Sequence, residues 1–186
     1  LALNQEKIRH KEWILTLSLL PWAVPKVVGG LMWKWIFDGN YGILNATLES
    51  LGFIDSYRWW FTGSPWIALG LAAVVEIWRT VPFTGLMFFA GLQKIPKVLY
   101  EAASLDGANE WQKFRFITWP ELGLVIMATL VLVTTWALKT FDTIYTLTGG
   151  GPGTKTMITY LYVYQQAFNY LNVGYGAALG YLVTIL

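Results

Sequence analysis

The chain has 186 residues, of which 55% are hydrophobic and only 13% are charged, and its net charge is +2. A typical soluble domain has about 25% charged residues, so this composition favours a chain that lies in a membrane. The small net charge gives no indication of nucleic-acid binding. The absence of cysteine excludes disulfides and thiolate metal sites, and a single histidine, His10, does not make a zinc site, so we expect no metal site on this chain.

Three segments are apolar and long enough to cross a bilayer as helices, which takes about 20 residues. They cover roughly 13–37, 66–92 and 122–145, and a fourth begins near Val173. The chain starts without Met and stops inside an apolar run, so we expect a fragment of a longer subunit, truncated at both ends. The sequence predicts an all-α, multi-pass membrane bundle that forms a single domain over residues 1–186, with about four spans represented.

Basic residues are concentrated in two of the four polar stretches that flank these segments. Residues 1–12 and 93–120 carry three and four Lys or Arg, whereas 38–65 has only Arg58 and 146–172 has only Lys155. Because cytoplasmic loops are enriched in basic residues, we expect 1–12 and 93–120 to face the cytoplasm. The three predicted spans separate the four stretches, so successive stretches lie on opposite sides of the membrane, which is consistent with this orientation.

The two outer stretches also contain local signals. Apolar residues recur at helical spacing over 41–51, which predicts a helix that lies along the membrane surface. The run at 58–61, Arg-Trp-Trp-Phe, is typical of an anchor at the membrane–water boundary. The Gly- and Pro-rich run at 148–153 cannot continue a helix and predicts a turn.

Ionisable residues at bilayer depth are costly and therefore are candidates for function. Lys26 lies near the middle of the first segment, and Glu76 and Arg79 lie near the middle of the second, three residues apart on one helix face. We expect these three to border a watery translocation path, and the alternative is an ion pair that only orients helices. Lys139 and Asp142 are expected to share another face, nearer the outer mouth.

The inner stretch 93–120 has the pattern of a bent pair of helices. Pro96 can begin a helix, because its missing N–H costs nothing there. A Glu-Ala-Ala run at 101–103 continues that helix with small side chains, and Gly107 permits a sharp turn. A second short helix is expected over 108–116, and Pro120 is expected to start the next membrane helix. The sequence predicts a helix–turn–helix elbow, with residues 105–108 at its tip.

This elbow resembles the EAA loop (E-A-A-x3-G-x9-I-x-L-P) of permease subunits of binding-protein-dependent ABC importers. Trp119 stands where that family prefers Leu, which is a conservative change for packing. The stretches 20–25, 90–96 and 141–152 are similar to the sugar-importer branch, of the maltose and glycerol-phosphate type. The residues that match the motif are Glu101, Ala102, Ala103, Gly107, Ile117 and Pro120.

The resemblance implies a permease of the type I importer kind in a prokaryotic inner membrane. Its expected partners are a second permease, two ATP-binding subunits and an extracytoplasmic solute-binding protein, and its expected substrate is a di- or oligosaccharide. ATP and Mg would be held by the partner ATPase, and no catalytic residue or cofactor is expected on this chain. The run Gly153-Thr154-Lys155-Thr156 lacks the second Gly of a phosphate-binding loop. The residues implied in coupling to the ATPase are Glu101, Ala102, Ala103, Leu105, Asp106, Gly107 and Ala108.

In sugar-transport families a neutral sugar is held by hydrogen bonds and by stacking on aromatic rings. Trp78 and Trp136, with Trp22 and Trp33, are candidates for such stacking, and the alternative is packing within the membrane. Prolines within the spans predict kinks, at Pro21, Pro25 and Pro82.

Three other classes of protein remain open at this point. An ion-coupled secondary transporter would use Glu76 or Asp142 to carry a proton and would work without an ATPase. A membrane enzyme would need clustered His, Asp or Cys at a membrane face, and the sequence has no such cluster. A scaffolding subunit would show no substrate-stimulated ATP hydrolysis.

Overall fold

The computed structural model describes residues 17–185, which are built from helices and contain no strand. These residues divide into two compact units. Unit 1 comprises the described residues up to Ala23 together with Arg79–Leu138, and unit 2 comprises Val24–Trp78 with the described residues from Lys139 onward.

Helix α5, Pro65–Gln93, confirms the second predicted span and is 29 residues long. At about 1.5 Å per residue it is longer than a bilayer core of about 30 Å. Pro65 occupies the first helical position, where its fixed φ suits a helix. The helix continues through Pro82, so this proline does not end it.

The other predicted spans are broken or short. In the first, α2 (Leu20–Ala23) and α3 (Lys26–Ile36) are separated at Pro25, which is extended at φ −55° and ψ 134°; residues 13–16 of that prediction lie outside the described residues. The prediction of one helix over 122–145 is wrong, because α9 (Gly123–Leu138) and α10 (Asp142–Leu147) are separate helices. The start of the fourth is confirmed, since α12 covers Val173–Ile185.

Length and apolarity identify the described helices that could cross a membrane. Within residues 17–185, α5 is the one unbroken helix that is long and apolar enough to cross a membrane. The segments Glu110–Glu121 and Gly123–Leu138 add a second crossing if they are counted together across their bend of 62°. The four predicted spans therefore correspond to one long helix, two interrupted segments and one shorter helix.

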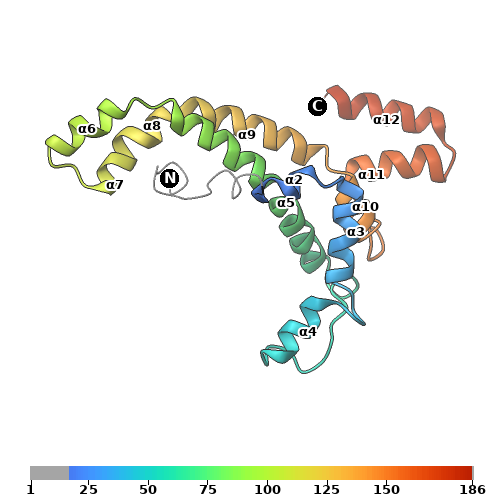
Figure 1. The fold of residues 1–186 in the computed structure, drawn as a ribbon. Coiled ribbons are helices and arrows are strands. Elements are labelled where there is room, and N and C mark those ends of the chain that lie inside the picture. Colours follow the sequence, from blue (N-terminus) through green and yellow to red (C-terminus); the bar gives the residue numbers. More distant parts are fainter. Residues whose placement is uncertain (1–16, 186) are drawn as a thin grey trace. The chain divides into compact units, whose positions relative to one another are not determined.

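In unit 1, a helical hairpin follows the end of α5 (Figure 1). Its first arm is α6, Lys97–Leu105. Its second arm runs without a break through α7 (Glu110–Lys113), a π-helical turn η2 (Phe114–Thr118) and α8 (Trp119–Glu121). Further along the chain, α9 packs closely on α5, because a Cβ added at Gly91 would lie 2.8 Å from Leu122 and 2.9 Å from Val125.

The core of unit 2 brings α10 against α3, and residues of α5 and α11 complete it. Its buried members are Phe37, Ala72, Val75, Ile144, Leu147 and Leu161. Gly30 of α3 makes the close approach possible, since a Cβ there would overlap Oγ1 of Thr146 and lie 2.9 Å from its Cβ. Residues 159–169, in the predicted polar stretch 146–172, form α11 (Thr159–Tyr164) and the π-helical turn η3 (Gln165–Asn169).

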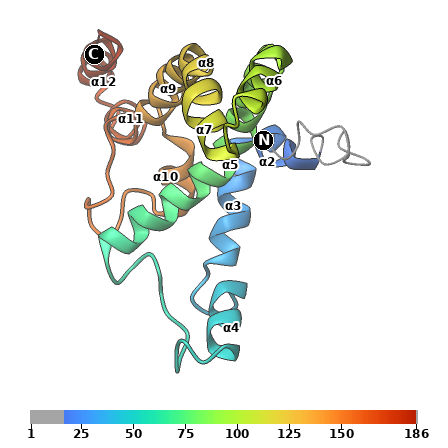
Figure 2. The same cartoon turned by 90° about the vertical axis from the view of Figure 1, so that its left-hand side faces the viewer.

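Helix α4, Ile43–Ser50, confirms a helix within the predicted 41–51 segment and lies beyond the end of α3 (Figure 2). Asn45 in α4 is fully buried and ties the surrounding loop together. Its Nδ2 donates to the carbonyl oxygens of Asp38 and Arg58, and its Oδ1 accepts from the Arg58 backbone N–H at 3.1 Å. One polar side chain therefore links α4 to the chain on both sides of it.

Candidate functional site

The first arm of the elbow, α6, presents its predicted coupling residues to solvent. Pro96 precedes the helix in an extended conformation, at φ −61° and ψ 128°, so α6 begins at Lys97 rather than at the proline. Glu101 and Ala102 are exposed, and Leu105 at the end of the helix is 90% exposed. An apolar side chain held in solvent beside an exposed carboxylate is suited to a contact with another protein.

The turn at the tip of the elbow is a Schellman motif. Gly107 has φ +79°, which is the left-handed conformation that glycine adopts without strain. The backbone N–H of Ala108 donates to the carbonyl of Ala103 at 2.9 Å, and that of Gly107 donates to Ser104 at 3.1 Å. These bonds satisfy carbonyls that the end of α6 would otherwise leave open, so the turn is fixed rather than a loose connection.

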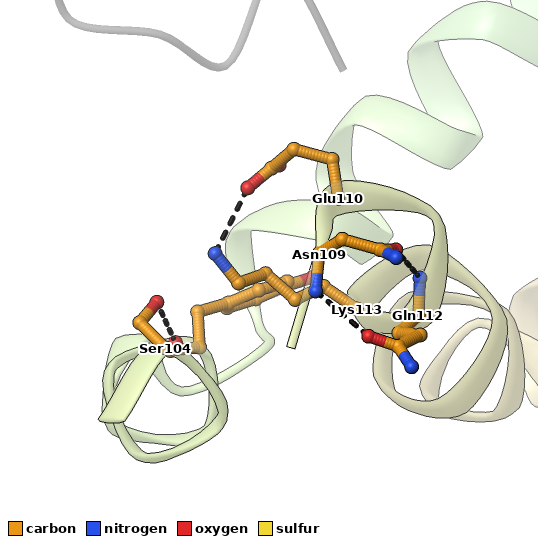
Figure 3. Close-up of polar contacts among 6 residues, drawn as sticks. Ser104, Asn109, Glu110, Gln112 and Lys113 are labelled. Carbon is orange, nitrogen blue, oxygen red and sulfur yellow. Dashed lines mark hydrogen bonds and ion pairs between the residues drawn. The ribbon is translucent and has the colours of Figure 1, made fainter. Parts of the chain in front are cut away.

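The second arm begins with a capping box at Asn109 (Figure 3). Oδ1 of Asn109 accepts from the Gln112 backbone N–H at 2.9 Å, and Oε1 of Gln112 accepts from the Asn109 backbone N–H at 2.8 Å. Lys113 Nζ lies 2.8 Å from Glu110 Oε1 in the same short helix. Because the Glu110 side chain is 91% exposed, this pair adds little stability and the capping box is the stronger constraint.

The two arms are joined near their base by the hydroxyls of Tyr100 and Thr118, which are 2.8 Å apart. Thr118 is 2% exposed, so this contact is shielded from water. Around it, the ring of Phe114 lies 5.6 Å from that of Trp111 and 6.2 Å from that of Trp119. The elbow is therefore a rigid body that carries an exposed tip.

The structure brings together all seven predicted coupling residues on α6 and the turn that follows it. Sequence reasoning missed Tyr100, Thr118 and Asn109, which hold the elbow in shape. The Asn-x-x-Gln spacing at 109–112 is a capping-box signal and was available in the sequence. The predicted second helix over 108–116 begins at Glu110 and continues to Glu121, and Pro120 lies inside it, so the next long helix starts at Gly123 rather than at the proline.

In unit 2, two of the predicted intramembrane charges are paired. Lys26 Nζ lies 3.8 Å from Oδ2 of Asp142, and the two side chains are 46% and 33% exposed. Asp142 is the first residue of α10, where a negative charge is favoured by the helix dipole. Lys26 is the first residue of α3, where a positive charge is disfavoured, so the nearby carboxylate offsets that cost.

A second contact in unit 2 ties Glu76 of α5 to α10, because Oγ1 of Thr143 donates to Oε1 of Glu76. Lys26 and Glu76 therefore each contact α10, at Asp142 and Thr143. The prediction that Lys139 and Asp142 share a helix face is wrong, because the helix is interrupted between α9 and α10. Lys139 lies in that interruption and is exposed. No Pro or Gly lies at the break, so local residue types do not predict it.

The aromatic candidates are packed against other rings. In unit 2, the ring of Trp78 lies 5.5 Å from that of Trp33, edge to face. In unit 1, Phe83 lies between two tryptophans, with ring centroids 4.8 Å from Trp136 and 5.8 Å from Trp22. Arg79, also in unit 1, is buried at 8% exposure. These ring contacts agree with packing within each unit.

No group of three or more His, Asp or Glu side chains with the geometry to hold a metal ion occurs in the part of the chain that the structure describes.

Comparison with known proteins gives a consistent picture. Residues 1–186 match the family described as binding-protein-dependent transport system inner membrane component. The chain is 43% identical to the sulfoquinovosyl glycerol transport system permease protein SmoG of Agrobacterium fabrum over 94% of its length, and 39% identical to the trehalose/maltose transport system permease protein MalF of Thermococcus litoralis over 100%. It spans 56% and 61% of these relatives.

Two further relatives support the same grouping. The diacetylchitobiose uptake system permease protein DasB of Streptomyces coelicolor is 34% identical over 96% of the chain and 55% of its own length. The fold is similar to that in a crystal structure of a bacterial ABC transporter involved in the import of the acidic polysaccharide alginate, with a TM-score of 0.84 over 99% of this chain and 65% of that one. At 22% identity, the latter likeness concerns the fold alone.

Proposed function

Because this chain belongs to the family of inner membrane components of binding-protein-dependent transport systems, we propose that it forms part of the translocation pathway of an ATP-driven importer. The observation that carries the proposal is the elbow, a rigid helical hairpin with Glu101 exposed on α6 and Leu105 exposed at its tip. A helical hairpin transmits motion from an ATPase to the membrane helices only if its own shape is fixed. The Tyr100–Thr118 contact, the Schellman turn and the capping box provide that rigidity.

ATP hydrolysis would reside on a separate subunit, which would also hold Mg. The elbow would dock into a groove on that subunit, with Glu101 accepting a charge-assisted hydrogen bond from an Arg or Lys. Two such ATP-binding subunits, a second permease and an extracytoplasmic solute-binding protein would complete the importer. This chain itself would make and break no covalent bond. The family match gives no support to an ion-coupled mechanism.

The proposed substrate is a di- or oligosaccharide or a similar glycoside. The names of three relatives, which refer to sulfoquinovosyl glycerol, trehalose/maltose and diacetylchitobiose, support this class. The ring pairs that include Trp78 and Trp136 would offer aromatic surface to a sugar. Lys26, Glu76, Arg79, Lys139 and Asp142 would border the path and bind hydroxyl groups or ordered water.

The proposed topology follows from the distribution of basic residues. The protein would cross the membrane several times, with residues 1–12 and 93–120 on the cytoplasmic side. The elbow would then project toward the cytoplasmic ATPase. The stretches 38–65 and 146–172 would lie on the outer side, where a solute-binding protein delivers substrate.

The experiment that tests this proposal alters the elbow in the full-length permease, in its complex. Glu101→Arg together with Gly107→Trp reverses the charge and strains the turn, and we expect loss of ATPase association and of sugar uptake in proteoliposomes. A matched control is Glu49→Arg with Gly52→Trp, which makes the same changes at exposed positions in and directly after α4. If the elbow variant assembles and transports sugar like the unaltered protein, the proposed coupling through the elbow is wrong.

Dependence on ATP is tested separately. We expect uptake to persist in vesicles made leaky to protons and to stop when ATP is removed. The reverse result would point to ion coupling instead.

A further inference from the structure

A hollow of about 350 Å³ lies in unit 2, beside the first turn of α5. The residues that line it and bear on its chemistry are Arg58, Trp59, Trp60, Thr62, Ser64 and Ile67. They supply one guanidinium, two hydroxyls, two indoles and one aliphatic side chain, and none of them has a carboxylate. Such a set combines hydrogen-bond donors with an apolar edge.

The donors in this hollow favour a ligand with anionic oxygens. Arg58 carries a fixed positive charge with five N–H donors, and this residue is exposed. Nε1 of Trp60 is buried and has no hydrogen-bond partner among the described residues. Because this nitrogen is buried, the donors open to a ligand are the Arg58 guanidinium and the hydroxyls of Thr62 and Ser64.

The backbone around the hollow is fixed before any ligand arrives. Asn45 holds Arg58 from both sides, through its backbone N–H at 3.1 Å and its carbonyl at 3.0 Å. The ring of Trp59 lies against Gly39, where an added Cβ would be 2.5 Å from the ring. The hollow is therefore preorganised, which lowers the entropic cost of binding.

An apolar track leads away from the hollow along α5. Ile67, Gly70, Val74 and Ile77 follow one another at three- and four-residue spacing, so they share a helix face. All four are exposed. The distance from Ile67 to Ile77 corresponds to a rise of about 15 Å, which is half the thickness of a bilayer core of about 30 Å.

We propose that the hollow binds the phosphate of an anionic phospholipid, and that one acyl chain of this lipid lies along the Ile67–Ile77 face. The inference rests on the proposed function, because it needs α5 to cross the bilayer with Pro65 near the water boundary. Arg58 and the hydroxyls would contact the phosphate, while Trp59 would occupy the headgroup region, as amphipathic rings do. A lipid tail of one leaflet would then end near the level of Glu76.

The test is native mass spectrometry of the intact importer complex after exchange into detergent containing phosphatidylglycerol or phosphatidylcholine. We expect the unaltered complex to retain phosphatidylglycerol preferentially. Arg58→Gln should lower that retention about tenfold, the effect of losing one charge-assisted hydrogen bond. Its backbone bonds to Asn45 do not involve the side chain, so the complex should elute unchanged.

Lys155→Gln is the matched control, because it removes the other exposed basic charge of the outer stretches, and it should leave retention unchanged. Equal retention by Arg58→Gln and the unaltered complex would overturn the proposal. Complete displacement of the lipid by millimolar inorganic phosphate would also overturn it, since the site would then select a free anion.

Failure of this site and failure of the proposed function are distinguishable. A complex that pumps sugar with ATP but shows no preference for phosphatidylglycerol contradicts the lipid site alone. A complex that retains the lipid but does not pump contradicts the proposed function.

Discussion

The hydroxyl of Tyr100 in α6 and Oγ1 of Thr118 in η2 are 2.8 Å apart, and this hydrogen bond joins the two arms of the elbow at their base. Tyr100 precedes the Glu-Ala-Ala run by one residue, and Thr118 lies two residues before Pro120. The contact therefore ties together the two ends of the predicted coupling motif.

Tyr100→Phe should weaken this junction without changing its shape. Thr118 is 2% exposed, so its hydroxyl would lose a partner in a place that water does not reach, at a cost of about 1 kcal/mol. We expect a lower melting temperature of the complex and a smaller stimulation of ATP hydrolysis by substrate. Tyr181→Phe, at a residue 75% exposed, is the control and should change neither measurement. Unaltered coupling in Tyr100→Phe would contradict the role of this bond.

Substitutions at Gly107 should separate backbone strain from steric clash. A Cβ at this position meets nothing within 4 Å, so the cost of a side chain here is the backbone strain of the left-handed conformation, at φ +79°. Gly107→Val should cost about 1–2 kcal/mol and reduce co-purification of the ATPase subunit, because a β-branched residue is disfavoured in the left-handed region. Gly107→Asn should retain most of the association, since Asn tolerates this conformation. Equal loss in both variants would indicate a clash with the partner instead of strain.

Gly30→Ala should destabilise unit 2 although alanine is the better helix former. The added Cβ would overlap Oγ1 of Thr146 in α10, and overpacking typically costs about 1–3 kcal/mol. The control is Gly70→Ala in α5, where a Cβ meets nothing within 4 Å and helix propensity predicts a gain of up to about 1 kcal/mol. Thermal unfolding of the two purified variants measures the difference. A gain in both would show that α3 and α10 do not approach closely.

The charges that contact α10 provide a test of the translocation path. The Lys26–Asp142 pair is 46% and 33% exposed, so after screening it should contribute less than about 1 kcal/mol to stability. If these residues border the path, Lys26→Met and Glu76→Gln should lower the uptake rate while melting changes little. Uptake and melting are measured on the same proteoliposome and detergent preparations. Unchanged transport and assembly in both variants would leave these residues with a purely structural role.

The elements that sequence reasoning predicted well are those with local signals. Helix α5 has a long apolar run opened by Pro65, and the elbow has Gly107 at the one position where a positive φ is needed. Helix α12 starts at Val173 as expected. In each of these cases the information lies within a few residues of the feature, so no tertiary contact is required to predict it.

The features that were missed depend on contacts between distant residues. The separation of α9 from α10 puts Asp142 beside Lys26 and Thr143 beside Glu76, which are more than 60 positions away in sequence. Because an apolar run of this length also suits one continuous helix, periodicity alone does not reveal the break. Asn45 was missed for the same reason, since its partners are seven and thirteen residues away.

The two π-helical turns have a consequence for how this chain tolerates changes in length. In η2 the N–H of Trp119 bonds to the carbonyl of Phe114, and in η3 that of Tyr170 bonds to Gln165, so each turn contains one residue more than an α-helical turn would. Removing a single residue from η2 would let an ordinary turn form while α7 and α8 on either side of it keep their orientation. The same deletion in the middle of α5 would rotate everything beyond it by about 100°.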